Sequence, residues 1–326
     1  MLLRPHLLAC TLAALCVGTS ATAADSYPSK PVKVMVALPA GGSADMLARV
    51  ISQELGTKLG QSFVVENKAG GSGQIGMPQV ARATPDGYTV LMGALGSLAI
   101  NASLLDKQNY SFVKDFKGVS VAITMPMALA VNDAVPAKTV QELIALAKSR
   151  PGKLTMGSAG NGSSQHMAGE LFKQITGTDI LHVPYRGSGP AVTDLLGGQI
   201  DMVIDTLPAL LPQLASGKIR ILGVTTDTRA PALPEVKTLA EQGVPGYAVA
   251  TTYALLAPTG TPAQAIEKMS MAMQQAGASP QLREGAAKLG AKATPTTPAA
   301  TDKVIAGEID KWGAVVRRSV TRTAKQ

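Results

Sequence analysis

Cysteine is scarce in this chain of 326 residues, and the two that occur, Cys10 and Cys16, lie near its start. That start has an apolar run from Leu7 to Val17 and then Ala21-Thr22-Ala23, a pattern typical of a signal peptide and its cleavage site. The run is too short for a permanent membrane anchor. We therefore expect residues 1–23 to be removed on export near Ala23. The mature chain would then have no disulfide, thiolate metal site or cysteine nucleophile.

Aromatic side chains are also rare, at 3 % of the chain with a single Trp. The formal net charge of +8 is spread along the sequence apart from a basic C-terminus. Without aromatic residues among the basic ones, the chain lacks the pattern that stacks nucleic-acid bases. It also lacks an H-E-x-x-H motif and carboxylates at ligand spacing. We therefore expect no nucleic-acid partner, no metal and no cofactor.

Strand and helix patterns alternate after the signal segment, which is typical of a parallel sheet covered by helices on both faces. Val32 to Leu38 is apolar like a strand, and the segment from Ser43 to about Lys58 repeats apolar residues on one helix face. Two long apolar stretches, Val119 to Val131 and Tyr247 to Ala257, lack a partner helix and indicate crossings between domains. The pattern predicts an α/β fold with two domains, residues 24–126 with 252–326 and residues 127–251.

Two glycine-rich turns each lead into a predicted helix. The first runs from Pro39 to Asp45, and the second runs from Gly157 to His166. Glycine and small hydroxyl residues leave backbone N–H groups uncovered at a helix entrance, where the helix dipole adds partial positive charge. Such an entrance can bind an anion without lysine or arginine. The two turns together predict a site for a small carboxylate.

Several side chains near these turns have both a functional and a structural interpretation. Asp45 lies in the first turn of its helix, where it either caps the helix or accepts a hydrogen bond from a ligand. Asp205 follows a predicted strand in a comparable place, and Arg186 either binds a carboxylate or is an ordinary surface arginine. His166 either contacts the ligand or packs, whereas we expect His182 to be structural.

Two enzymatic interpretations have less support. His166 beside Ser163 or Ser164 would be the base of a hydrolase, but no G-x-S-x-G elbow occurs in the chain. Gly71 to Gly76 matches the dinucleotide pattern G-x-G-x-x-G, but it begins several residues past its strand, and the next strand ends without an acid for the ribose hydroxyl. We therefore expect a binding protein and not an enzyme, with a secreted serine/histidine hydrolase as the alternative.

The mature chain resembles the substrate-binding proteins of tripartite tricarboxylate transporters, the Bug-type (TctC-like) periplasmic receptors, over nearly its whole length. The resemblance is carried by many short motifs in order: Tyr27 to Val32, Pro39 to Asp45, Val65 to Lys68, Gly70 to Gly76, Pro85 to Tyr88, Val183 to Gly187 and Gly198 to Asp201. The aromatic residue that this family usually has near the first turn is absent here, because Ala37 and Leu38 precede Pro39.

The resemblance implies a two-domain periplasmic-binding-protein fold (type II), each domain a mostly parallel sheet flanked by helices, which closes on one ligand like a flytrap. It implies a first set of ligand-binding residues: Leu38, Pro39, Gly41, Gly42 and Asp45, with Gly93 and Ser97. It implies a second set: Ser158, Gly160, Asn161, Gly162, Ser163, Ser164 and His166, with Tyr185, Arg186, Gly187 and Asp205 as neighbours.

The partners follow from the same resemblance. It implies a monomeric periplasmic receptor that delivers a small organic carboxylate to the membrane permease subunits of a tripartite transporter. A sensor subunit that presents its ligand-bound form to a membrane kinase would use the same site, so the sequence does not separate the two roles.

Overall fold

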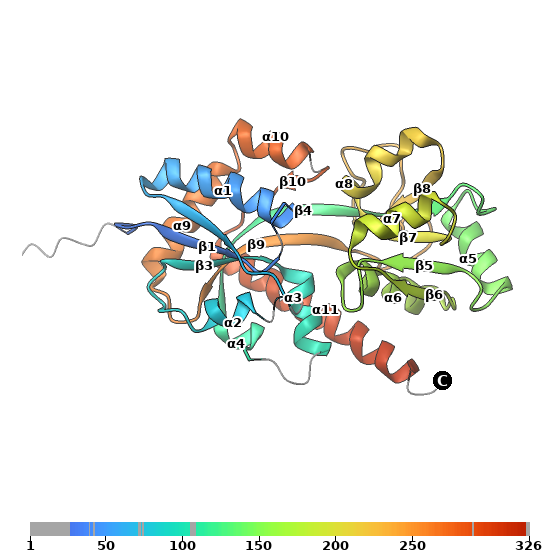
Figure 1. The fold of residues 1–326 in the computed structure, drawn as a ribbon, viewed down its shortest axis with the longest axis horizontal. Coiled ribbons are helices and arrows are strands. Elements are labelled where there is room, and N and C mark those ends of the chain that lie inside the picture. Colours follow the sequence, from blue (N-terminus) through green and yellow to red (C-terminus); the bar gives the residue numbers. More distant parts are fainter. Residues whose placement is uncertain are drawn as a thin grey trace, which may run out of the picture.

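The computed structural model describes residues 27–38, 40–41, 43–70, 73, 75–104, 109–288 and 290–323 (Figure 1). The expected signal segment, and Pro39 and Gly42 of the first turn, lie outside the described residues. Within the described ranges, no helix combines the length and the apolar character needed to cross a bilayer.

Three parallel strands form the first part of the sheet. β1 (Val32–Val36) lies between β2 (Phe63–Asn67) and β3 (Thr89–Ala94) and runs parallel to both. Most residues of β1 and β3 are buried, because helices cover both faces of these strands. The strands therefore end at one edge, where the chain enters α1 (Ser43–Leu59) after β1 and α3 (Leu95–Leu104) after β3.

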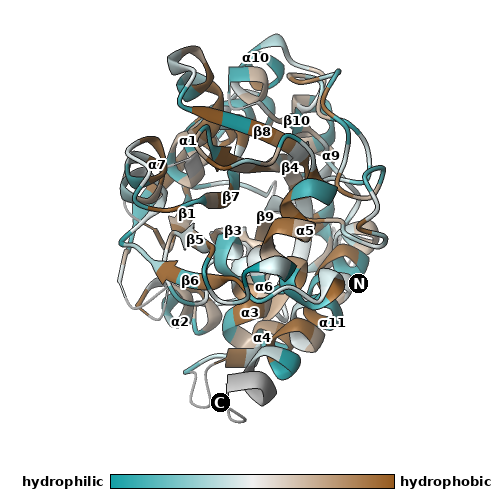
Figure 2. Cartoon of the chain, turned by 90° about the vertical axis from the view of Figure 1, so that its right-hand side faces the viewer, coloured by the Kyte–Doolittle hydropathy of each residue, from teal (hydrophilic) through white to brown (hydrophobic). Residues whose placement is uncertain are grey.

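A second parallel group has the same construction. β5 (Thr155–Ser158) lies between β6 (Leu181–Pro184) and β7 (Met202–Thr206) and runs parallel to both. The chain enters α6 (Ser164–Thr176) after β5 and α7 (Ser188–Leu196) after β6. Most residues of β7 are buried, and its first three are hydrophobic. Figure 2 views the molecule from this half.

Two long strands join the groups. β4 (Phe116–Asn132) pairs antiparallel with β9 (Ala250–Pro258) over residues 116–126, and with β7 and β8 (Ile219–Val224) over residues 127–132. β9 in turn pairs antiparallel with β3. The chain thus passes from the first group to the second along β4 and returns along β9 (Figure 1). In the sheet, these two antiparallel strands lie between the parallel strands of the two groups.

The remaining elements cover the faces of this sheet. α1, α9 (Ala263–Ala276) and α10 (Pro280–Lys288) enclose one core with the first strand group, and α7 and α8 (Leu207–Leu210) enclose another with the second. A third core runs along both groups. The helices that contribute to it are α2 (Gly76–Ala81), α3, α4 (Phe112–Asp115), α5 (Val140–Ser149), α6 and α11 (Pro298–Thr323). A short strand, β10 (Lys292–Ala293), pairs with β4, and a 3₁₀ turn spans Leu211–Ser216.

The helix pattern differs from the sequence-based expectation in several places, and the helix expected up to Ala215 is the short α8 followed by the 3₁₀ turn. The sequence predicts a helix from about residue 74 to residue 83, which in the structure is the shorter α2, and it predicts none of α3, α4 and α10. α2 ends at Ala81, two residues before the expected end. The segment Thr84-Pro85-Asp86 follows, and Pro85 prevents the helix from continuing. α3 matters most for function, because it starts directly at the end of β3.

Candidate functional site

A cavity of about 280 Å³ lies where the two strand groups meet. Its lining joins five segments: the residues just after β1, α2, the end of β3, α3, and the turn before α6. The lining residues are Ala37, Leu38, Met77, Met92, Gly93, Ala94, Ser97, Asn101, Ala159, Asn161, Gly162 and Ser163. The structure therefore brings Leu38, Gly93 and Ser97 of the first expected set to one cavity with Asn161, Gly162 and Ser163 of the second, whereas Gly41 and Asp45 are absent from its lining.

Two helix entrances meet at this cavity. α3 begins at Leu95 with no acidic residue in its first turn, and α6 likewise has none. The hydroxyl oxygens of Ser97 in α3 and Ser164 in α6 lie 3.1 Å apart, so one hydroxyl donates to the other across the two strand groups. The positive ends of two helix dipoles thus point at one small space, which favours an anion there.

The first turn is organised by Asp45. Its Oδ2 accepts a hydrogen bond from the N–H of Gly41 at 2.9 Å, and the Arg49 guanidinium lies 3.1 Å from its Oδ1. The Gly41 N–H and the Arg49 side chain hold the pKa of this carboxyl below its usual range. Asp45 therefore caps the turn through Oδ2, whereas its buried Oδ1 faces Arg49 as an ion pair and accepts no hydrogen bond from the described residues.

The second turn depends on two glycines with positive φ. Gly160 has φ of 121° and Gly162 has φ of 74°, and side chains other than glycine are strained in this region. The N–H of Gly160 donates to Ser158 Oγ at 3.1 Å, and the N–H of Gly162 donates to His166 Nδ1 at 3.1 Å. These two N–H groups, expected to bind ligand, are occupied in the structure by side chains of the turn itself.

Other N–H groups of the second turn remain open. Ser163 is the N-cap residue of α6, and its Oγ accepts from the N–H of His166 at 3.1 Å. Within the described residues, the N–H groups of Asn161 and Ser164 donate to no other group of the protein. Asn161 also lines the cavity. The turn can therefore offer backbone donors to an anion at the entrance of α6.

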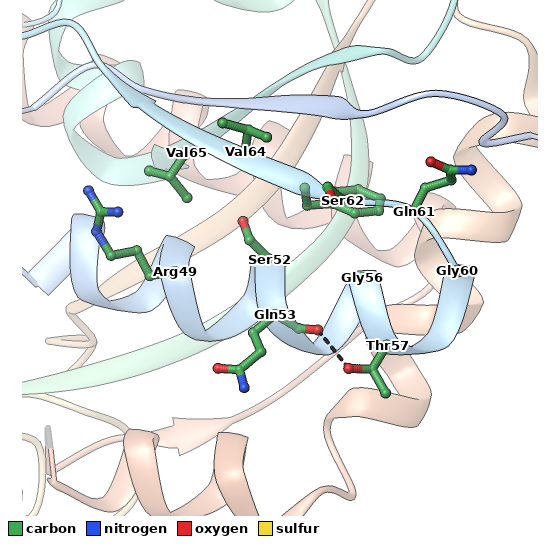
Figure 3. Close-up of a pocket in the computed structure, with 11 residues that line it drawn as sticks. Arg49, Ser52, Gln53, Gly56, Thr57, Gly60, Gln61, Ser62, Val64 and Val65 are labelled. Atoms are coloured by element: carbon green, nitrogen blue, oxygen red, sulfur yellow. Dashed lines mark hydrogen bonds between the residues drawn. The ribbon is translucent and has the colours of Figure 1, made fainter.

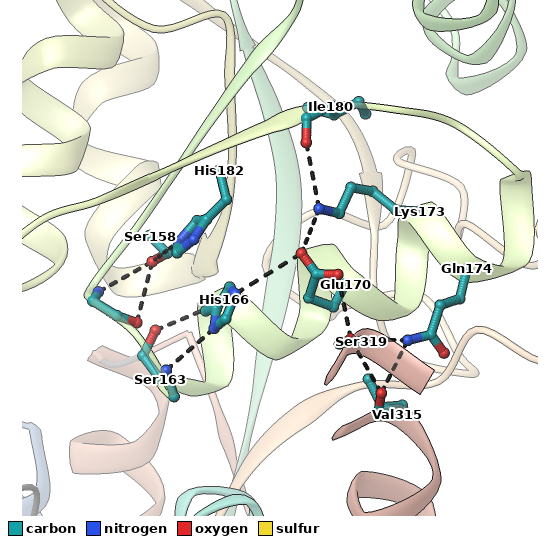
Figure 4. Close-up of polar contacts among 12 residues, drawn as sticks. Ser158, Ser163, His166, Glu170, Lys173, Gln174, Ile180, His182, Val315 and Ser319 are labelled. Carbon is teal, nitrogen blue, oxygen red and sulfur yellow. Dashed lines mark hydrogen bonds and ion pairs between the residues drawn. The ribbon is translucent and has the colours of Figure 1, made fainter. Parts of the chain in front are cut away.

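The two histidines form a stacked pair behind this turn (Figure 4). The rings of His166 and His182 lie 4.0 Å apart between centroids at an angle of 17°. His182 Nε2 lies 2.7 Å from Ser158 Oγ, and His166 Nε2 lies 3.8 Å from Glu170 Oε1. Burial lowers the pKa of both rings, to about 4 for His182, where the neighbouring His166 lowers it further. His166 thus supports the turn from behind and is absent from the 280 Å³ cavity.

The remaining predicted residues lie on the second strand group, outside the lining of the cavity. Asp205 is 1 % exposed, and it accepts hydrogen bonds from Gln165 Nε2, from the Thr206 N–H and from Ser188 Oγ. Burial raises the pKa of this carboxyl. Asp205 therefore ties the starts of α6 and α7 together.

Three of these predicted neighbours lie around the start of α7. The Tyr185 hydroxyl donates to Asp194 at 2.7 Å and so points along α7. Gly187 is the N-cap residue of α7, and Arg186 beside it is exposed. None of the three lines the cavity.

The site does not have the arrangement of a hydrolase. A nucleophile and its base must lie within hydrogen-bond reach and be open to substrate. His166 Nδ1 accepts from a backbone N–H, and Ser163 Oγ accepts from the backbone of His166. Ser158 does lie close to His182, but it is 1 % exposed and its Oγ accepts from Gly160. Nor do the described ranges gather three or more potential metal-ligating side chains at one point.

A larger groove of about 890 Å³ runs between α1 and β2 (Figure 3). Its lining is mostly small and uncharged, and its only cation is Arg49. That guanidinium is already paired with Asp45 and lies 3.4 Å from Asn67 Oδ1. The smaller cavity is therefore the better candidate for an anion, because helix entrances point into it.

Comparisons with known proteins agree with this picture. Residues 47–320 match the family model described as the tripartite tricarboxylate transporter family receptor. The chain is 37 % identical to a structure titled R. palustris Rpa4515 with adipate, with a TM-score of 0.79 and coverage of 89 % of this chain and 97 % of that one.

Two further solved structures are also similar. MatC (Rpa3494) from Rhodopseudomonas palustris with bound malate is 32 % identical, with a TM-score of 0.76 and coverage of 89 % and 100 %. The periplasmic binding protein BugD is 32 % identical, with a TM-score of 0.75 and coverage of 90 % and 98 %. These likenesses confirm the expected two-domain α/β fold of periplasmic binding proteins.

Proposed function

Because the chain belongs to the receptor family of tripartite tricarboxylate transporters, we propose that it binds a small organic carboxylate between its two strand groups. The observation that carries this proposal is the convergence of the entrances of α3 and α6, with the end of β1, on one cavity. The relatives solved with adipate and with malate support a dicarboxylate as the ligand.

Backbone donors are sufficient for useful affinity. A hydrogen bond to a charged group contributes roughly 1.5–3 kcal/mol. Four to six such bonds would therefore exceed the roughly 8 kcal/mol of a micromolar complex, and the excess offsets lost ligand freedom and domain closure. In this proposal the N–H groups of Asn161 and Ser164 bind one carboxylate, and the turn between β1 and α1 binds the other.

Closure would complete the site. We propose that residues 24–126 with 252–326 form one domain, and residues 127–251 the other. The change of β4 partners between Pro126 and Met127 supports this boundary. A ligand that contacts both domains favours the closed state, because only closure makes the second set of contacts. Tyr185, Arg186, Gly187 and Asp205 would approach the ligand or position its neighbours in that state.

The remaining roles follow from the family. We place the mature protein in the periplasm after removal of residues 1–23, as a monomeric receptor without enzymatic activity that delivers its ligand to membrane permease subunits. The engaged hydrogen bonds of Ser158, Ser163 and His166 support binding over hydrolysis.

A thermal-shift panel tests the proposal. Purified mature protein is heated with adipate, malate, succinate, citrate, glutamate and benzoate, and with adipic acid dimethyl ester as the uncharged control. A ligand that binds only the folded state raises the melting temperature with the logarithm of its excess over Kd. We expect at least one carboxylate to raise it and the ester to leave it unchanged. No response to any of these acids would contradict the proposal.

A further inference from the structure

We propose that His166 and His182 are positioning residues, and that the pair holds the second turn in its ligand-binding conformation only while His166 Nδ1 carries no proton. This inference rests on the proposed carboxylate site, because it concerns the turn that supplies its donors. It assigns a role behind the turn to two side chains that touch no part of the 280 Å³ cavity.

The direction of one hydrogen bond fixes the protonation state of His166 Nδ1. The Gly162 backbone N–H can only donate, so His166 Nδ1 must accept and must be unprotonated. A protonated ring carries N–H at both nitrogens, and Nδ1–H would then face the N–H of Gly162. The turn at Gly162 would have to move away. Since Gly162 lies between Asn161 and the start of α6, both proposed donors would move with it.

His182 completes the support. It stacks on His166 and lies 2.7 Å from Ser158 Oγ, and that same oxygen accepts the N–H of Gly160. The two rings therefore hold the turn at two points, Gly160 through Ser158 and Gly162 directly. Two stacked rings at 4.0 Å cannot both be charged without strong repulsion, so each ring favours the neutral form of the other.

Protons can reach the pair from its outer side. A cavity of about 570 Å³ behind α6 is lined by both histidines, and the His166 side chain is 19 % exposed. The charged groups that face the pair are Glu170 and Lys173 on α6. Asp179, before β6, lines the same cavity. From α11, the Ser319 hydroxyl donates a hydrogen bond to Glu170. Burial and Lys173 lower the pKa of His166, whereas Glu170 raises it.

The direct test observes the ring nitrogens. Removal of the leader leaves His166 and His182 as the only histidines, so two-bond ¹H–¹⁵N spectra of the mature protein give two ring systems. We expect His166 at pH 7.5 to be neutral with its proton on Nε2. A proton on Nδ1, or a charged ring at this pH, would overturn the proposal. This measurement needs no ligand, so it is decided independently of the proposed function.

The second test uses binding of adipate, measured by calorimetry at pH 7.5 and pH 5.5. His166→Leu removes the acceptor, and we expect affinity to fall about tenfold at pH 7.5, the typical effect of an unpaired buried donor. His166→Asn places Oδ1 near the position of Nδ1, so it should recover most of that loss. The wild type should bind more weakly at pH 5.5, whereas the His166→Asn variant should show no such change.

Further variants separate positioning from folding. His182→Phe keeps a stacked ring but loses the bond to Ser158, so it should weaken adipate binding while the melting temperature stays within a few degrees of wild type. Glu241→Gln, in the exposed pair with Arg229, is the control. Equal affinities of the Leu and Asn variants at residue 166 would refute the role of Nδ1. If the wild type binds no acid of the thermal-shift panel, the proposed function fails by itself, and the ring-nitrogen spectra still decide the present proposal.

Discussion

Gly162 lies in the second turn with a left-handed backbone conformation, so a substitution there perturbs the proposed site directly. Gly162→Ala adds a Cβ at φ of 74°, where alanine is strained. Gly177→Ala is a matched control, because Gly177 has φ of 65° and caps the other end of the same helix, far from the cavity. Both changes strain the backbone, but only the first lies in the proposed binding turn.

The expected magnitudes follow from the surroundings. A residue other than glycine costs roughly 1–2 kcal/mol in the left-handed region. A Cβ at Gly177 would meet nothing within 4 Å, and one at Gly162 would lie 3.2 Å from Leu104 Cδ1, the tip of a flexible side chain that can move. Both variants should therefore lose about 1–2 kcal/mol of unfolding free energy. If the turn shifts to relieve this strain, the Gly162→Ala variant loses one or more of the backbone N–H donors proposed to bind the ligand.

The assay combines urea unfolding with calorimetric titration of adipate. Loss of one charge-assisted hydrogen bond of roughly 1.5–3 kcal/mol weakens binding about tenfold to 150-fold. Gly162→Ala should show this loss, and Gly177→Ala should bind like the wild type. If the two variants are equally destabilised and bind adipate equally well, the second turn does not hold the carboxylate.

Three further predictions concern other parts of the structure. Trp312 is the only Trp, is fully buried and lies beside the start of α3, so its fluorescence should change on adding adipate, and Trp312→Phe should remove that signal. Asp45→Asn keeps an acceptor for Gly41, so its urea midpoint should fall less than that of Asp45→Ala. The lowered pKa values of His166 and His182 favour the neutral rings in the folded state, so their contribution to stability is present above about pH 6.5 and is lost as pH falls toward 4. Urea midpoints at pH 7.5, 6 and 4.5 should decline, and a His166→Asn/His182→Gln double variant should decline less.

Much of the fold could be predicted because its strands and most helices have clear patterns. The crossing segments were recognisable as long apolar runs, and β4 and β9 occupy them. α3 was not recognisable for the opposite reason. Most of its residues up to Asn101 are buried, so it lacks the polar face that gives a helix its period. α10 has only Leu282 and Ala286 buried, too few to form a pattern.

The site was predictable in outline but not in its hydrogen bonds. Glycine-rich turns at helix entrances are typical of anion sites, and the structure brings the second turn to the cavity beside the end of β1. The sequence could not show that the N–H groups of Gly41 and Gly162 are taken by side chains four residues later, because those side chains could equally face solvent. Met77, Met92 and Asn101 were missed, since only the folded chain brings them to the cavity.

A crystal structure of the mature protein with adipate would show where the carboxylate groups bind. We expect one carboxylate within about 3 Å of the backbone nitrogens of Asn161 or Ser164 and the other at the turn between β1 and α1. Adipate bound instead in the groove between α1 and β2, or behind α6 beside the two histidines, would contradict this expectation.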